Sequence, residues 1–162
     1  MLKWRNLMAA IELDKKDRKI LSILQRQANI PNNELAEQVN LSPSTCLRRV
    51  RRLEELGVIR GYVALLDKDK IGRSLCVFVR VKLDHKSRAD VERFEQEVLQ
   101  YPEVTECHVV MGEDDFLLKI MVADLNDFQK FLLDHLTAIP GLSTVISSAV
   151  LRQVKSTTEL PL

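Results

Sequence analysis

The stretch NNELAEQVNLSPSTCLRRVRRLEELGVI, residues 32–59, predicts two short helices joined by a tight turn. Asn40 is expected to end the first helix, because asparagine tolerates a left-handed backbone. Ser42 can cap the second helix, and Pro43 suits its first position, where a missing N–H costs nothing. Gly57 then ends the second helix. This arrangement is typical of a helix–turn–helix, whose second helix enters the major groove of DNA.

The apolar residues of both predicted helices recur every three or four positions, which places them on one face of each helix. Asn32 and Asn33 are expected to cap the first helix, since a short polar side chain can accept a hydrogen bond from a free backbone N–H. The residues expected to face inward are Leu35, Ala36 and Val39 of the first helix, and Leu47, Val50 and Leu53 of the second.

The remaining side chains of the second helix suit contact with DNA. Its first turn is small and polar, so the backbone can approach a groove, and the arginines that follow can neutralise phosphates. The alternative is a solvated face of an ordinary three-helix bundle, which needs the same caps and apolar stripes. We expect Ser44, Thr45 and Arg48 to read bases, because the first turns of such a helix reach base edges. The full set expected to contact DNA is Ser42, Ser44, Thr45, Arg48, Arg49, Arg51 and Arg52.

The charge of the chain is divided unevenly. Residues 1–66 carry 12 Lys and Arg against 7 Asp and Glu, whereas residues 67–162 carry 12 against 16. The net charge of +1 therefore hides a basic first half and an acidic second half. A basic half with a helix–turn–helix suits a nucleic-acid-binding domain joined to a body of a different kind.

The cysteines and the apolar runs exclude several classes of protein. Cys46, Cys76 and Cys107 are odd in number and lack a CxxC spacing, which argues against a disulfide framework. Cys46 is expected to be a small buried residue of the second helix. The sequence shows neither a signal peptide nor an apolar run of transmembrane length. We therefore expect a cytoplasmic protein without a membrane partner.

An additional helix is expected before the helix–turn–helix, because Asp14 and Asp17 have the spacing of a capped helix start. This helix would brace the two that follow and complete a three-helix head. Two interpretations stay open for the first dozen residues: Trp4 and Leu7 pack on a partner, or the true start lies near Met8.

The second half alternates between strand and helix patterns. Period-two alternation predicts strands, and apolar spacings of three and four predict helices. The order βαββαβ is that of a ferredoxin-like domain, with both helices on one face of the sheet and the first and third strands, the most apolar, at its centre. The expected strands are 75–83, 104–111, 116–123 and 145–154, and the expected helices are 87–99 and 125–136.

The predicted fold class is therefore α+β, with an N-terminal head of the winged helix–turn–helix kind and a C-terminal ferredoxin-like domain. We expect the head at 1–60, a linker strand and loop at 61–72, and the ferredoxin-like domain at 73–162. The second face of the sheet is too apolar for water, so another subunit is expected to cover it. The residues assigned to that face are Cys76, Phe78, Val109, Met111, Leu117, Met121, Ile146 and Val150.

Several long motifs in a fixed order resemble the Lrp/AsnC family, the feast/famine regulators. The head carries L-D-x-x-D-x-x-I-L at 13–21 and L-S-x-x-x-C-L-x-R-V-x-x-L-E-x-x-G-x-I at 41–59. The body carries E-C-H-x-V-x-G-x-x-D-x-L-L-K at 106–119. The resemblance covers nearly the whole chain, from about residue 13 to residue 155. It implies a DNA-binding head, an effector domain, dimers that assemble into octamers or larger rings, and control by small amino acids.

The turn after the strand 104–111 is the candidate effector site. From the residues alone, the acidic turn that follows Gly112 is either a solvated turn or an anionic loop for the ammonium of an amino acid. The resemblance favours the second interpretation, because the family's effector pocket is built around this Gly-x-x-Asp turn. A divalent metal is a weaker option, since a bare acidic turn lacks a full oxygen cage. The residues expected to bind the amino acid are Val109, Met111, Gly112, Asp114, Asp115, Ser148 and Val150.

The sequence therefore predicts a transcription regulator that binds double-stranded DNA specifically and responds to a small free amino acid such as leucine or methionine. It needs no cofactor and forms a homo-oligomer. The alternative is an architectural DNA-compacting protein with the same head and no effector response. An enzyme is not expected, because no Ser/His/Asp, Cys/His or Gly-rich phosphate loop has a workable spacing. Cys107 and the adjacent His108 point to opposite faces of a strand, so they cannot share a metal.

Overall fold

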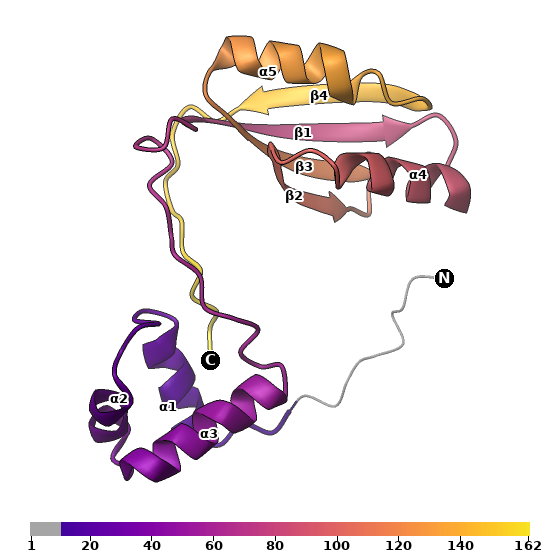
Figure 1. Ribbon diagram of the computed structural model, residues 1–162. Coiled ribbons are helices and arrows are strands. Elements are labelled where there is room, and N and C mark those ends of the chain that lie inside the picture. The colour runs from indigo at the N-terminus through magenta and orange to yellow at the C-terminus, as the bar shows by residue number, and fades with distance from the viewer. Residues whose placement is uncertain (1–10) are drawn as a thin grey trace. The chain divides into compact units, whose positions relative to one another are not determined.

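The computed structural model describes residues 11–162 (Figure 1). The expectations for Trp4, Leu7 and Met8 fall outside these residues. The chain divides into two compact units, which we call the helical domain and the sheet domain. The helical domain contains the described residues up to Leu65 together with Lys155–Leu162, and the sheet domain contains Leu66–Val154. The last eight residues were predicted to belong with the sheet, but the structure groups them with the helices.

Three helices form the helical domain: α1 (Lys15–Leu24), α2 (Asn32–Val39) and α3 (Pro43–Glu55). Their apolar faces meet in one small core, as predicted. The buried apolar residues of this core are Ile20, Leu21, Ile30, Leu35, Ala36, Val39, Cys46 and Leu53.

The ends of these helices follow from local chemistry. Asp14 and Asp17 form the predicted capping box at the start of α1, Asn40 has a φ of 53° after α2, and Ser42 caps α3. The predicted cap of α2 is wrong, because Pro31 occupies the cap position and Asn32 is already helical. The Asn32 side chain instead donates a hydrogen bond of 2.9 Å to a carbonyl at the start of α3.

The inward face of α3 differs from the prediction by one residue. Cys46 is fully buried, whereas Leu47 is 39% exposed. Positions 46, 50 and 53 have spacings of four and three, so they form one continuous helical stripe. Leu47 lies about 100° away from Cys46 on the same helix and is left at the edge of the stripe. The buried, small apolar role expected of Cys46 is confirmed.

The linker after α3 is extended but is not a strand. The N–H groups of Val58 and Ile59 both donate to the Leu53 carbonyl, so these residues close the end of α3. In the described part of the chain Gly61–Leu66 pairs with no strand, contrary to the prediction. Val63 is 78% exposed and Leu65 is 74% exposed. An isolated apolar segment cannot satisfy its backbone groups as a strand without a neighbour.

The sheet domain has the predicted βαββαβ order. Its elements are β1 (Leu75–Leu83), α4 (Arg88–Val98), β2 (Val104–Val109), β3 (Phe116–Val122), α5 (Leu125–Phe131), a π-helical turn (Leu132–Leu136) and β4 (Leu142–Ala149). The spatial order is β2-β3-β1-β4, and all neighbours are antiparallel. The two apolar strands are central, as predicted. The side chains of α4 and α5 pack on the same face of the sheet, in a core built around Phe94, Phe116 and Phe131.

Two register shifts change details of the predicted sheet. A bulge in β2 between Val104 and Glu106 reverses the side-chain alternation. Val109 consequently stands opposite Phe116, on the face that the helices cover, and its assignment to the other face is wrong. The last strand begins at Leu142 and ends at Ala149 rather than spanning 145–154. Its last residue, Ala149, pairs with Val77, and one further hydrogen bond joins the Val150 N–H to the Cys76 carbonyl near the start of β1.

Phe94→Ala should lower the free energy of unfolding by about 3–5 kcal/mol, because it empties a packed aromatic site. The Phe94 ring lies 4.4 Å from that of Phe116, centroid to centroid, and is 1% exposed. Urea unfolding followed by circular dichroism measures the loss. Leu99→Ala is the control, since Leu99 is 76% exposed and its truncation should change stability little. Equal losses in the two variants would contradict the assigned core.

Candidate functional sites

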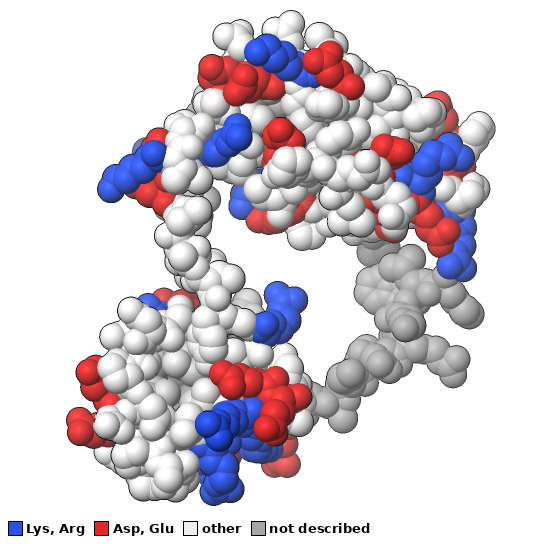
Figure 2. Space-filling view, in the orientation of Figure 1, with Lys and Arg blue, Asp and Glu red and all other residues white. Residues whose placement is uncertain are grey.

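The outward face of α3 presents a line of polar and basic side chains. Ser44, Arg48 and Arg51 have spacings of four and three, so they lie on one side of the helix, opposite Cys46. All three are exposed. Figure 2 shows basic side chains gathered on the helical domain where α3 lies in Figure 1. This face can therefore approach a polyanion without rearrangement of the core.

The two other small polar residues of this region are engaged with each other. The Ser42 Oγ accepts a hydrogen bond of 3.3 Å from the Thr45 N–H and donates one of 2.8 Å to the Thr45 Oγ1. Ser42 therefore caps α3, and Thr45 is half-buried beside it. Ser44 Oγ also lies 3.3 Å from Ser42 Oγ, so Arg48 is the predicted base-reading side chain with fewest contacts within the head.

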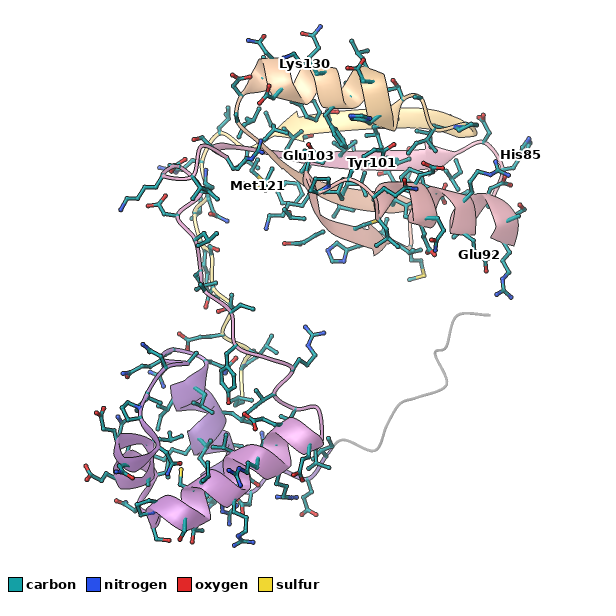
Figure 3. All side chains as sticks on the ribbon, in the orientation of Figure 1. His85, Glu92, Tyr101, Glu103, Met121 and Lys130 are labelled. Atoms are coloured by element: carbon teal, nitrogen blue, oxygen red, sulfur yellow. The ribbon has the colours of Figure 1, made fainter. Side chains whose placement is uncertain are left out.

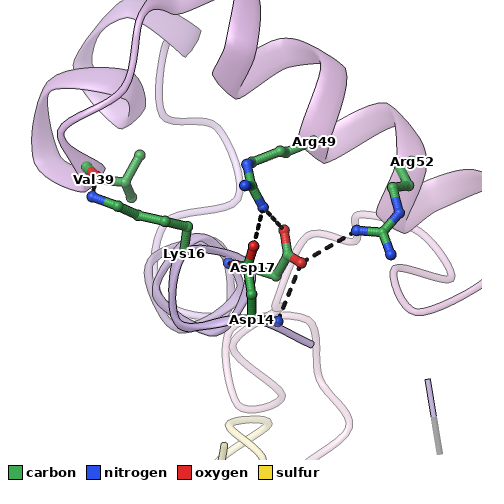
Figure 4. Close-up of polar contacts among 6 residues, drawn as sticks. All are labelled: Asp14, Lys16, Asp17, Val39, Arg49 and Arg52. Atoms are coloured by element: carbon green, nitrogen blue, oxygen red, sulfur yellow. Dashed lines mark hydrogen bonds and ion pairs between the residues drawn. The ribbon is translucent and has the colours of Figure 1, made fainter. Parts of the chain in front are cut away.

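A buried carboxylate ties α3 to α1. Asp17 is 1% exposed, and its two oxygens face two arginines of α3 (Figure 4). Arg49 Nη1 lies 2.8 Å from Asp17 Oδ1 and 2.7 Å from Asp14 Oδ2, while Arg52 Nη1 lies 3.4 Å from Asp17 Oδ2. From the sequence, Asp17 was expected only to help cap α1. The spacing of Arg49 from the inward residues Cys46 and Leu53 could have indicated a half-inward arginine that needs an acid.

These contacts also shift the pKa values of Asp14 and Arg49. The hydrogen bond from the Asp17 N–H, and then that from Arg49, lower the pKa of Asp14. Hydrogen bonds to the carboxylates of Asp14 and Asp17 raise the pKa of Arg49. The Arg49 guanidinium is thus committed to α1, and its Nε has no hydrogen-bond partner among residues 11–162. Beside it lies a hollow of about 260 Å³ lined by Asp14, Arg48, Arg49 and Arg52, which could receive an anion.

The turn between β2 and β3 is pinned to the end of β1. The Val110 N–H donates to the Asp115 carbonyl, and the Asp115 N–H donates to the Val81 carbonyl. Gly112 has a φ of 150°, which side chains rarely adopt. Within the described chain, the backbone N–H groups of Met111 through Asp114 make no hydrogen bond. They remain available to an acceptor from outside.

The two carboxylates of this turn already face basic groups. Asp115 Oδ1 lies 2.6 Å from Lys86 Nζ, and Asp115 Oδ2 accepts a hydrogen bond of 3.0 Å from the Leu83 N–H. Burial raises the pKa of Asp115, but these hydrogen bonds outweigh it and hold the pKa below its usual value. Asp114 Oδ2 lies 3.2 Å from Arg80 Nη1. Both signs of charge therefore lie within a few ångströms, as a zwitterion requires. Arg80 and Lys86 were not predicted, although a lone arginine in an apolar strand was a usable signal.

The rest of the predicted effector set does not gather around this turn within one chain. Ser148 stands opposite Phe78, and the Val150 N–H donates to the Cys76 carbonyl. These positions lie three and five residues along β1 from Val81, or roughly 10 and 16 Å at about 3.3 Å per residue. Met111 is fully exposed and Val109 lies on the helix-covered face. The antiparallel register of β4 is the reason for the separation.

A second hollow lies in the sheet domain. It measures about 330 Å³ and has apolar walls from Leu66, Ile71 and Met121 with charged groups from Arg73 and Glu103. Figure 3 labels Met121 and Glu103 beside one another on this domain. A hollow of this size could also hold a small ligand.

The described residues offer little for metal or thiol chemistry. No three His, Cys, Asp or Glu side chains in 11–162 are placed to hold a metal ion. Burial raises the pKa of the Cys46 and Cys76 thiols, and it raises that of Cys107 to about 11. Thiolates are the nucleophilic form, so these shifts reduce the reactive fraction of the three cysteines near neutral pH. In the same described range, every helix is too short or too polar to cross a membrane.

The family of the chain is shown by comparison with known proteins. A model of the Lrp/AsnC ligand binding domain matches residues 76–160, and a model of winged helix-turn-helix DNA-binding domains matches residues 13–60. The chain belongs to the Lrp/AsnC family. It is a transcription regulator with a DNA-binding head and a ligand-binding domain, and the resemblance stated from the motifs is confirmed.

The relatives cover almost all of the chain. The leucine-responsive regulatory protein of Rhizobium meliloti (strain 1021) is 45% identical over 92% of this chain and 96% of its own length. The DNA-binding transcriptional activator DecR of Escherichia coli (strain K12) is 42% identical over 93% of this chain and 99% of its own. A transcriptional regulator from Neisseria meningitidis, solved in complex with L-methionine, has a TM-score of 0.89 and 43% identity, covering 93% of this chain and 97% of its own.

Asp17→Asn should lower the free energy of unfolding by about 3 kcal/mol, because removing one partner of a buried ion pair leaves the others uncompensated. The loss is expected at the low end of the range for such pairs, since Asp14 still faces Arg49. Urea unfolding at neutral pH measures it. Asp134→Asn, an exposed change in the sheet domain, should leave stability unchanged. If the two variants unfold at the same urea concentration, Asp17 does not hold α3.

Proposed function

We propose that this regulator binds DNA sequence-specifically through the outward face of α3 and that a small apolar amino acid alters its assembly or its DNA binding. The observation that carries the DNA part is the exposed line of Ser44, Arg48 and Arg51 on a helix fixed by the Asp17 ion pairs. The observation that supports the ligand part is the pinned turn at Gly112, which offers both signs of charge.

The four arginines of α3 take three roles in this proposal. Arg48 lies in the second turn of the helix and reads a base edge together with Ser44, with Thr45 supporting them. Arg51 and Arg52 neutralise phosphates further along the helix. Arg49 contributes indirectly, because its guanidinium is held by Asp14 and Asp17. Phosphate contacts supply affinity without sequence information, whereas bidentate contacts to bases supply discrimination.

Arg48→Ala should relax base preference, at a cost of about 1–3 kcal/mol in discrimination between the operator and its variants. Arg51→Ala, which spares the Asp17 ion pairs, should instead weaken binding to all sequences and reduce the slope of log K against log salt concentration by about 1. Titrations of operator and random duplexes at several salt concentrations separate the two effects. Lys130→Ala, in α5 of the other domain, is the control. Parent-like binding by both arginine variants would remove α3 from the interface.

The chemistry of the turn suits a free amino acid. The unpaired N–H groups of Met111 through Asp114, with Arg80 or Lys86, can take the ligand carboxylate, and Asp114 or Asp115 can take its ammonium. The relatives that respond to leucine or hold L-methionine support an apolar side chain on the ligand. Arg80 and Lys86 can move from the aspartates to the ligand carboxylate, so ligand binding exchanges one set of ion pairs for another.

A second copy of the chain would complete this site. Met111 is fully exposed, and Ser148 and Val150 of the same chain lie away from the turn. The uncovered face of the sheet carries Phe78 and Ile146, which are 37% and 39% exposed. We propose that copies of the chain pair through this face and the extended linker to form dimers, and that dimers assemble further, to an octamer or a similar ring. Ligand binding and assembly are then reciprocally linked.

Asp114→Asn should weaken binding of leucine and methionine at least about tenfold, the effect of losing a charge-assisted hydrogen bond of about 1.5–3 kcal/mol. This change spares the Leu83 contact, which belongs to Asp115. Calorimetry with both amino acids measures the affinity, and native mass spectrometry measures assembly with and without ligand. Glu113→Ala, an exposed change in the same turn, is the control.

Equal affinity in parent and Asp114→Asn would remove Asp114 from the site. If Asp115→Asn also bound like the parent, the turn would be excluded and the hollow beside Met121 would become the candidate site. Absence of binding by any amino acid would favour the architectural DNA-compacting function instead. Such a protein would condense DNA through the same heads, but no ligand would change its assembly or its DNA binding.

A further inference from the structure

Within the last eight residues of the chain, Glu159 and Leu160 contact the end of α1. Gln25 Nε2 donates a hydrogen bond of 3.1 Å to the Leu160 carbonyl, and the Leu160 N–H donates one of 2.6 Å to Gln25 Oε1. Figure 1 shows the C-terminus at the helical domain. The family model for the ligand-binding domain extends to residue 160, but the structure groups Lys155–Leu162 with the helical domain.

The two hydrogen bonds form a reciprocal pair, like one rung of a β-ladder. A glutamine amide has a donor and an acceptor side by side, as a peptide group does. The N–H and C=O of one extended residue point to the same side of the chain, so a single glutamine can satisfy both. Pro161 follows Leu160 and biases it towards this extended conformation. The sequence of the segment therefore favours the geometry that Gln25 recognises.

The receiving side chains are held in place by α1 itself. Gln25 is the C-terminal cap residue of α1, and its N–H donates to the Leu21 carbonyl. Arg26 folds back on the helix, donating through Nε to the Ser22 carbonyl and through Nη2 to the Ser22 Oγ. In that position Arg26 Nε lies 3.8 Å from Glu159 Oε2. The Glu159 N–H donates to the Thr157 Oγ1, which orders the segment before it reaches Leu160.

We propose that Lys155–Leu162 is a strap, and that Gln25 and Arg26 form its docking site on the helical domain, which is the DNA-binding domain; the sheet domain is the ligand-binding domain. The chain passes between the two domains at Leu65–Leu66 and again at Val154–Lys155. When the strap is docked, the DNA-binding domain has two connections to the ligand-binding domain instead of one: the covalent linker, and the strap held by hydrogen bonds to Gln25 and an ion pair with Arg26. Two connections restrict its rotation about the extended linker, so the strap limits the operator spacings that an oligomer accepts. This last step rests on the proposed DNA binding, whereas docking does not.

Photo-crosslinking of the full-length protein tests the docking directly. The photoreactive residue p-benzoyl-L-phenylalanine, placed at position 162, should crosslink to the peptide that contains Gln25, within one chain. Gln25→Ala should reduce that product roughly tenfold, since two hydrogen bonds are lost. Gln25→Glu keeps an acceptor for the Leu160 N–H but loses the donor, so it should fall between parent and Gln25→Ala. Gln27→Ala, an exposed change on the same loop, should leave the yield unchanged.

Three results would overturn the docking proposal: an unchanged yield in Gln25→Ala, crosslinks to the ligand-binding domain, or a product with the mass of two chains. The consequence for DNA is tested by deleting residues 157–162. On duplexes whose half-sites are moved apart by about half a helical turn, the parent should lose affinity severalfold more than the deletion variant. If the parent and the deletion variant lose affinity equally, while the parent still crosslinks as expected, the strap docks but does not restrict rotation of the DNA-binding domain. If neither protein binds DNA specifically, the proposed function fails and the crosslinking result still stands.

Discussion

The buried carboxylate of Asp17 is the contact on which the DNA-binding domain depends. A helix of thirteen residues with only two fully buried side chains, Cys46 and Leu53, has little apolar surface to fix its rotation. The ion pairs from Asp17 to Arg49 and Arg52 supply that missing constraint, because charge pairs have a preferred direction and apolar contacts do not. They leave Ser44, Arg48 and Arg51 on the opposite side of the helix, free for contact with DNA.

In the DNA-binding domain ion pairs fix a helix, whereas in the ligand-binding domain the ion pairs lie at an exposed turn. Its acidic turn is anchored by a backbone hydrogen bond to β1, but its carboxylates face basic side chains that can exchange partners. In the proposed ligand site, the hydrogen-bonded backbone of the turn would stay in place while these ion pairs exchange partners with a zwitterion. The same domain in a single chain leaves an apolar sheet face open, so ligand and second copy would act on neighbouring surfaces.

Local signals predicted most of the fold. The caps at Asp14 and Ser42, the left-handed Asn40 and the βαββαβ order all depend on residues close in sequence, and all are confirmed. The predictions failed where residues distant in the sequence determine the structure. The bulge near Glu106 depends on pairing with the neighbouring strand, and the strand expected at Gly61–Leu66 has no partner among residues 11–162. For the same reason the ion pairs of Asp17, the basic partners of Asp114 and Asp115, and the docking of Leu160 were out of reach of pattern reasoning.

The bulge in β2 has a consequence for solubility. By reversing the alternation, it places Glu106 and His108 on the open face of an edge strand, where Glu106 lies 2.7 Å from Lys119 Nζ and 3.3 Å from His108 Nε2. Edge strands that present a flat apolar ladder invite pairing with other chains without limit, and charge or irregular backbone on the edge prevents it. One extra residue therefore lets this domain keep an apolar surface for a chosen partner while its free edge stays protected against aggregation.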